Sequence, residues 1–208
     1  MVSDDAPGWV GFNKIKREIS LDIGGHVLLV RPMRPDDVDR FVSYWHGGEA
    51  DLAYLGIDPI KLGSPEDTRR RFLDMCRYGD RNASAVGFSF ILDGRPVGFC
   101  NGNLRDRRAY IHIHIVDATA RSEGLASAAL TRAFPAIAAQ AMSDYDLDEL
   151  VLETRSRNSR INHLAEKLPI PVVGPVYLDD PDGLAGPGEF FIRRIPKVWI
   201  TAINDVNS

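Results

Sequence analysis

Cysteine is scarce in this sequence: among its 208 residues only Cys76 and Cys100 carry a thiol. The two lie far apart and form no CxxC motif or Cys/His ligand spacing, so we expect neither a disulfide framework nor a metal site. Cys100 stands in an apolar run, which favours a core residue over a nucleophile.

Long apolar runs are absent as well, since no stretch approaches the roughly 20 apolar residues that a helix needs to span a bilayer. Residues 1–9 are acidic and polar, without the basic start and apolar core of a secretory signal. We therefore expect a cytoplasmic protein with no membrane partner. Positive charge is not in excess either, because the formal net charge is -4, and this argues against a nucleic-acid partner.

What the sequence does contain is the composition of an ordinary globular domain, with 44% hydrophobic and 26% charged residues. No internal repeat is visible, and this length suits one large domain. We expect an N-terminal arm at residues 1–17, a single domain at residues 18–196 and a tail at residues 197–208.

Hydrophobic periodicity predicts an α/β domain built on a mixed, mostly antiparallel sheet. Strands are expected at residues 18–23, 26–31, 86–92, 96–103, 110–116, 149–154, 172–178 and 189–195. Helices are expected at residues 36–46, 64–78, 124–142 and 159–168. Two turn signals, Gly24-Gly25 and Asp93-Gly94, join neighbouring strands as hairpins. Pro135 lies inside the third helix and is expected to bend it.

The segment that carries chemistry is the strand at 110–116, the turn at 117–122 and the helix that begins at Gly124. A helix N-terminus presents unpaired N–H groups and a partial positive charge, which suits a phosphate group. Gly124 lacks a Cβ atom, so the main chain can approach a pyrophosphate closely. Arg121 and Ser122 can add a charge and a hydroxyl, and the pattern as a whole is R-x-x-G-x-A.

The run Arg121-Ser122-Glu123-Gly124-Leu125-Ala126 resembles the acyl-CoA-binding motif of the GNAT acetyltransferases, usually written Q/R-x-x-G-x-G/A. The sequence from Glu153 through Asn158 to Glu166-Lys167-Leu168 resembles the strand and helix that follow in that family. The likeness covers about residues 27–195, and it implies a GNAT-like sheet of about seven strands flanked by about four helices.

The resemblance also implies where an acyl donor binds. The strands at 110–116 and 149–154 would splay apart and hold acetyl-CoA between them. The implied cofactor-binding residues are His114, Ile115, Val116, Arg121, Ser122, Glu123, Gly124, Leu125, Ala126, Ser127 and Asn158. The main chain of 114–116 would bond the pantetheine arm, and residues 122–127 would wrap the pyrophosphate. Asn158 would touch the pantetheine arm, although a simple helix cap explains it equally well.

Attack of an amine on a thioester needs a base that takes the amine proton. Glu153 matches the position of the general base in the Rim-type branch of the family, and the alternative is a surface or salt-bridged carboxylate near Arg155. His112 and His114 are rival bases on the neighbouring strand, because imidazole titrates near neutral pH. Since both share one side-chain face, we expect a single environment to decide for both.

One departure from the family pattern concerns the general acid. Ala165 stands where many relatives have a tyrosine that protonates the leaving thiolate. His163, Ser159, Tyr177 or water remain as substitutes, and departure of the thiolate without an acid is the other alternative. Five basic residues also surround the last helix, either as a solvated face or as a contact for the CoA 3′-phosphate or an acidic substrate. They are Arg155, Arg157, Arg160, His163 and Lys167.

Together these residues predict an enzyme that moves an acetyl group from acetyl-CoA to a primary amine in a ternary complex. The amine belongs to a protein N-terminus, a lysine or a small molecule, and the entry at residues 51–55 leans towards the Rim-type enzymes that acetylate protein N-termini. Two alternatives stay open: a longer-chain acyl-CoA N-acyltransferase of antibiotic, siderophore or sugar metabolism, and a non-catalytic CoA-binding module. The acceptor depends on the loops at 51–63 and 179–188. A homodimer through Val198-Trp199-Ile200 is a further expectation.

Overall fold

The structure is a computed structural model that describes residues 18–48, 50–80, 82–122, 124–168 and 170–198. Eight strands form one sheet in the order β1-β2-β3-β4-β5-β6-β8-β7. The strands are β1 (Ile19–Ile23), β2 (His26–Pro32), β3 (Ala85–Leu92), β4 (Arg95–Arg105), β5 (Arg108–Ile115), β6 (Glu149–Arg155), β7 (Val172–Leu178) and β8 (Gly188–Pro196). Every neighbouring pair is antiparallel except β5 with β6, which run parallel. The predicted mixed, mostly antiparallel sheet is confirmed, with eight strands in place of about seven.

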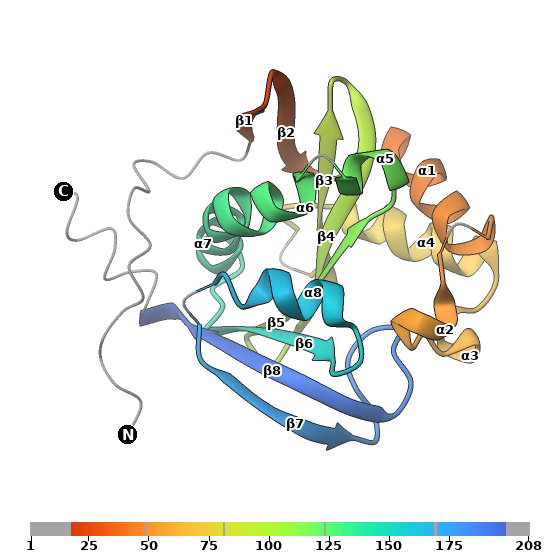
Figure 1. Ribbon diagram of the computed structural model, residues 1–208, viewed down its shortest axis with the longest axis vertical. Coiled ribbons are helices and arrows are strands. Elements are labelled where there is room, and N and C mark those ends of the chain that lie inside the picture. The colour runs from red at the N-terminus through yellow and green to blue at the C-terminus, as the bar shows by residue number, and fades with distance from the viewer. Residues whose placement is uncertain (1–17, 49, 81, 123, 169, 199–208) are drawn as a thin grey trace.

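Helices cover both faces of this sheet (Figure 1). They are α1 (Pro35–His46), α2 (Leu52–Leu55), α3 (Pro59–Leu62), α4 (Pro65–Met75), α5 (Ala118–Ser122), α6 (Leu125–Ala128), the π-helix η1 (Ala129–Ala133), α7 (Phe134–Asp144) and α8 (Ser159–Ala165). The count exceeds the four expected because the segments at 52–62 and 118–133 form short helices. None of the described helices is both long and apolar enough to cross a membrane.

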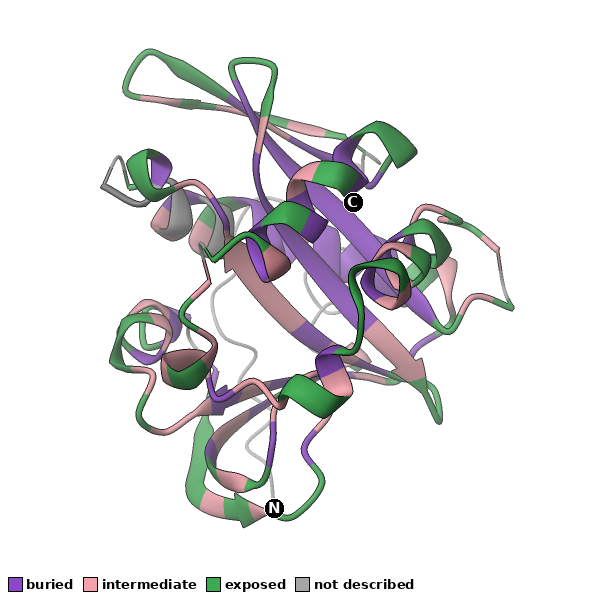
Figure 2. Cartoon of the chain, turned by 90° about the vertical axis from the view of Figure 1, so that its right-hand side faces the viewer, coloured by how far each residue is buried: buried purple, intermediate pink, exposed green. Residues whose placement is uncertain are grey.

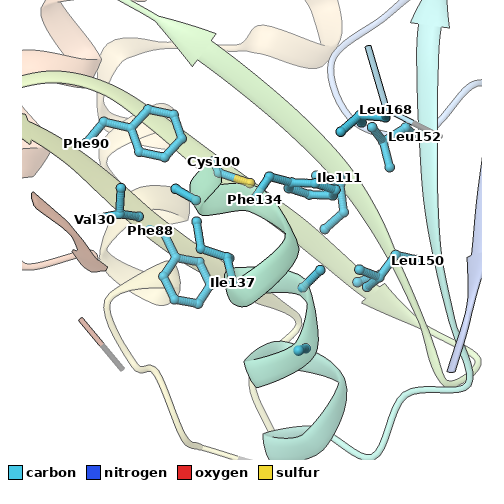
Figure 3. Packing of buried hydrophobic residues seen from close by; sticks show 14 of the residues in the cluster. Val30, Phe88, Phe90, Cys100, Ile111, Phe134, Ile137, Leu150, Leu152 and Leu168 are labelled. Atoms are coloured by element: carbon cyan, nitrogen blue, oxygen red, sulfur yellow. The ribbon is translucent and has the colours of Figure 1, made fainter. Parts of the chain in front are cut away.

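Two cores follow from the period-two alternation of the strands. Cys100 and its strand neighbours of the same face pack under α7, where Phe134 and Ile137 close the larger core (Figure 3). Phe99 points to the opposite face and packs with Phe41 and Phe72 from α1 and α4. In Figure 2 the central strands are buried, whereas the outer sides of the helices and the hairpin tips are exposed. Burial raises the pKa of the Cys100 thiol to about 12, so its predicted role as a core residue is confirmed.

The helix expected from 124 to 142 is interrupted, and the turn expected at 117–122 is partly helical. Asp117 Oδ1 accepts the amide of Thr119 at 2.8 Å and so starts α5. Before Pro135 the chain widens into the π-helix η1. Proline has no N–H to donate to the preceding turn, and a π-turn is one way to absorb that missing bond. The predicted bend thus takes the form of a π-helical segment.

A similar correction applies to the loop expected at 51–63, which contains two one-turn helices. Asp51 caps α2 by accepting the amide of Tyr54 at 2.9 Å, and Asp58 caps α3 by accepting the amide of Ile60 at 2.8 Å. Gly56 between them has a φ of 71°, a left-handed conformation that suits glycine. The arm at 1–17 and residues 199–208 of the tail lie outside the described residues, so the domain boundaries stay a prediction.

Candidate active site

The site begins where two parallel strands stop pairing. β5 and β6 are in register from Arg108 opposite Glu149 to Ile111 opposite Leu152, and their pairing ends there although both strands continue. The first residue beyond the last pair is His112 on β5 and Glu153 on β6. The splay that the family resemblance implied is therefore present, and two of the three predicted catalytic residues stand at its fork.

These two side chains are connected by a loop residue that no sequence motif had marked. Asp182, between β7 and β8, donates its main-chain amide to Glu153 Oε2 at 3.0 Å. Its carboxylate oxygen Oδ2 lies 3.1 Å from His112 Nε2 and accepts a hydrogen bond from the side-chain Nδ2 of Asn103 at 2.6 Å. Arg105 completes the shell with a 3.5 Å contact to Oδ1. Glu153 is thus not paired with Arg155, which was the alternative reading of this residue.

His114 has a different environment from His112, so the expectation of one shared environment is wrong. Its ring lies 4.9 Å from the centroids of both Trp45 and Phe99, between α1 and the sheet. Burial lowers the pKa of His114 to about 3, and the nearby His112 adds to the effect. The surface that His114 retains faces a cavity rather than bulk solvent. At neutral pH this imidazole is uncharged and a weak base.

That cavity has a volume of about 580 Å³ and opens beside the fork of β5 and β6. Its floor is the sheet, and its walls come from α1, α4, α8 and the loop between β7 and β8. The apolar part of the wall includes Trp45, Leu55, Ile57, Phe72 and Phe99. All three predicted catalytic residues line it, so the structure brings Glu153, His112 and His114 into one space.

The predicted pyrophosphate loop lies between α5 and α6. Gly124 has a φ of 75°, and a Cβ atom built on it would meet nothing within 4 Å. Its carbonyl accepts the amide of Ala128 at 3.0 Å, which closes the first turn of the helical run. Ser127 Oγ is 3.2 Å from Lys167 Nζ, so one basic residue of the α8 region reaches this loop. The side chains of Arg121, Ser122, Leu125 and Ala126 and the whole of Glu123 lie outside the described part of the chain.

The end of β5 carries a bulge at the residues expected to bind the pantetheine arm. The amides of Val116 and Asp117 both donate to Val97 O, at 2.8 and 3.2 Å. Arg40 donates to Val116 O at 3.3 Å. Val116 therefore has both main-chain groups engaged within the protein, whereas His114 and Ile115 belong to the strand itself.

Comparison with known proteins identifies the fold. A family model described as the acetyltransferase (GNAT) domain matches residues 27–169. The chain belongs to the GNAT acetyltransferases. The resemblance predicted from the R-x-x-G-x-A motif is thereby confirmed, and the chain is an enzyme of the N-acetyltransferase class.

Solved structures show the same fold at low sequence identity. The RimL ribosomal L7/L12 α-N-protein acetyltransferase in complex with coenzyme A is 17% identical, covers 86% of this chain and 98% of its own, and has a TM-score of 0.63. The ribosomal-protein-S5-alanine acetyltransferase from Vibrio fischeri is 14% identical over 86% and 97%, with a TM-score of 0.62. The microcin C7 self-immunity acetyltransferase MccE, solved with acetyl-CoA and AMP, is 13% identical over 81% and 92%, with a TM-score of 0.60. No curated protein sequence matches the chain.

Relative to the GNAT pattern, this chain lacks a side-chain acid at the expected place. Ala165 is fully buried and lines the cavity. Of the predicted substitutes, His163 is exposed beside Glu166, and Tyr177 is 62% exposed on β7. Neither of them, nor Ser159, lines the cavity, and the described lining contains no tyrosine. Water as the acid, and departure of the thiolate without an acid, therefore stay open.

The position of Asn158 is compatible with both of its predicted roles, the helix cap and the contact with the pantetheine arm. Its Oδ1 accepts the amide of Ile161 at 3.4 Å as the cap of α8, and the residue also lines the cavity. The basic residues near it serve mostly structural contacts. Arg155 donates to Gly56 O at 3.2 Å and to Gly186 O at 3.0 Å, and Arg157 donates to Ala53 O. The cluster therefore ties the α2 segment and the β7–β8 loop to the fork.

Proposed function

We propose that this GNAT enzyme binds acetyl-CoA in the fork between β5 and β6 and transfers the acetyl group to a primary amine in a ternary complex. The observation that carries the proposal is the end of pairing at Ile111 and Leu152, immediately before His112 and Glu153. An extended amide-bearing arm fits between two strands that have stopped pairing with each other. The RimL and MccE structures, solved with coenzyme A and with acetyl-CoA, support the same donor.

The chain offers a place for each part of that donor. The amides that follow Gly124, at the start of the helical run of α6, η1 and α7, would hold the pyrophosphate. Lys167, beside Ser127, would add a positive charge to that loop. Asn158 lines the cavity on the way to the fork and would hold the pantetheine arm. The bound thioester supplies an acyl carbon that an amine can attack.

Glu153 is the proposed general base. Asp182 N–H fixes one of its carboxylate oxygens, which leaves the other to accept a proton from the amine. His112 is the second proton acceptor, held in place by its contact with the Asp182 carboxylate. His114 is unsuited to this role because burial lowers its pKa to about 3. Its neutral ring instead forms part of the aromatic wall with Trp45.

The donor assignment is tested by thermal unfolding with acetyl-CoA. A donor at 100 times its dissociation constant stabilises the folded state by about 2.7 kcal/mol, which raises the melting temperature of a chain of this size by several degrees. Glu153→Gln should keep this shift and lower kcat by about 100-fold or more, because it removes a base and leaves the binding loop intact. Glu189→Gln, exposed on β8, is the matched control. Absence of any shift at saturating acetyl-CoA would refute the proposal.

A panel of acyl donors distinguishes the acetyl reading from a longer acyl group. The small Ala165 in the cavity wall leaves open which acyl chain is preferred, and the kcat/KM values of acetyl-, propionyl- and longer acyl-CoA decide it. Acetyl-CoA binding without turnover on any amine would instead support the non-catalytic module.

The predicted homodimer is a separate proposal: Val198 is 64% exposed, and sedimentation analysis of the full chain measures the association directly.

A further inference from the structure

One side-chain amide in the cavity wall has no hydrogen-bond partner among the residues that the structure describes. Asn101 of β4 is 8% exposed and lines the cavity directly opposite His112. Its neighbour on the same face, Asn103, donates to Asp182. The Asn101 side chain, in contrast, makes no hydrogen bond within the described part of the chain. Its side-chain oxygen and nitrogen are not among the fully buried atoms without a partner, so they retain access to the cavity and can bond a ligand that enters it.

Cations outnumber carboxylates in the wall of the same cavity, although the chain as a whole has a formal charge of -4. Lys61 is paired with Asp180 at 2.7 Å and Arg105 with Asp182 at 3.5 Å. Arg71 and Arg155 have no carboxylate within 4 Å among the described residues, and only Glu153 remains as an unpaired anion. Among the described residues that line the cavity, none belongs to the pyrophosphate loop at 117–127.

Arg71 holds its charge at the wall through uncharged partners. Its Nη1 donates to Lys61 O at 2.7 Å, and its Nη2 donates to Thr68 Oγ1 at 3.0 Å. Burial lowers the pKa of the Arg71 guanidinium, and the nearby Asp67 only partly opposes this effect. Arginine stays protonated in proteins. The wall therefore carries the positive charge of a half-buried guanidinium that is not paired with a carboxylate of the described residues.

From these observations, and resting on the proposed transfer to an amine, we propose that the acceptor is a small amine that carries a carboxylate. The carboxylate is held by Arg71 and Asn101, and the amine faces Glu153 and His112. A guanidinium and a side-chain amide are both donors to carboxylate oxygen. The positive wall also disfavours the protonated amine, which keeps the attacking nitrogen in its reactive form. A cavity of about 580 Å³ is in the range of small-molecule sites.

The test compares matched acceptors. ω-Amino acids with two to five methylene groups are paired with the methyl-terminated amines of the same length, and the ratio of their kcat/KM values is measured at saturating acetyl-CoA. We expect the carboxylate member to be preferred by about 10-fold or more. The isosteric Asn101→Asp places a negative charge at the anion site and should reverse or abolish this preference. Arg70→Gln changes an exposed residue of α4, the helix that carries Arg71, and should leave the ratio unchanged.

Stability measurements separate a binding role for Asn101 from a structural one. Asn101→Leu removes an amide that has no partner, so it should not lower the unfolding free energy, yet it should lower the preference for the carboxylate. A ratio near one in the wild-type enzyme, or a ratio that Asn101→Asp leaves unchanged, would overturn the acceptor class. Preference for a peptide with an acidic second residue over every small amine would overturn it as well. If acetyl-CoA binds and neither the small amines nor peptide N-termini or lysines are acetylated, the proposed transfer itself is refuted.

Discussion

The buried His114 makes a quantitative prediction about acid stability. His114→Phe keeps a ring between Trp45 and Phe99 but removes the titrating group. In the unfolded chain a histidine has a pKa near 6.5, whereas burial lowers the pKa of His114 to about 3 in the folded chain. The unfolded state therefore binds the proton first as the pH falls. The contribution of the neutral His114 to the unfolding free energy is fully present above about pH 6.5 and is lost progressively below it, down to about pH 3.

The size of this loss follows from linkage. Each unit of pH below 6.5 costs about 1.4 kcal/mol of unfolding free energy, so about 2 kcal/mol is lost between pH 7 and pH 5. Water in the cavity reduces this figure, because part of the ring faces that space. Urea unfolding of the wild type and of His114→Phe at both pH values measures it. The variant should lose less stability than the wild type over this interval, and equal losses in both proteins would show that His114 is not held neutral.

Three further predictions concern single residues with defined contacts. Asp37→Asn should cost about 3–5 kcal/mol and Asp36→Asn almost nothing in urea unfolding, because Asp37 forms a buried bidentate pair with Arg31 at 2.7 and 2.9 Å. Arg193→Met should raise the urea midpoint, since Nε and Nη1 of this 3% exposed residue have no partner among the described residues; a lower midpoint contradicts this reasoning. Gly124→Ala should cost about 1–2 kcal/mol at its φ of 75° and also weaken the thermal shift with acetyl-CoA, unlike Gly79→Ala, whose φ of 88° carries the same strain outside the loop.

The strands of the sheet were predictable because each has a strong local pattern. Phe99 and Cys100 alternate between the two cores, and Asp93 and Gly94, both with positive φ, form the turn that their sequence indicated. The end of the strand pairing at Ile111 was accessible only through the family resemblance. No property of the local sequence distinguishes Ile111, which pairs with β6, from Ile113, which pairs only with β4, because this pairing depends on the path of β6.

The residues that complete the site were not predictable in the same way. Asp182 lies 29 positions from Glu153 in a loop rich in Asp, Gly and Pro, and only the folded chain brings its amide to that carboxylate. The caps at Asp51 and Asp58, the latter followed by Pro59, were recognisable N-terminal helix signals that could have predicted α2 and α3. Long-range contacts were therefore not predictable from the sequence, whereas the local capping signals of α2 and α3 were visible in it.

The fork between β5 and β6 has a physical cause on each of its two sides. Beyond the last pair, β5 stays bound to β4, where Val116 and Asp117 both donate to Val97 O. β6 stays bound to β8 as far as Arg155 opposite Phe190, and the Arg155 guanidinium holds carbonyls on the far side. Each strand is therefore drawn towards its outer neighbour, and the sheet opens between them. The separation is thus accounted for by contacts within the protein itself, and an extended donor arm would lie in it without breaking a strand pair on the way to Glu153.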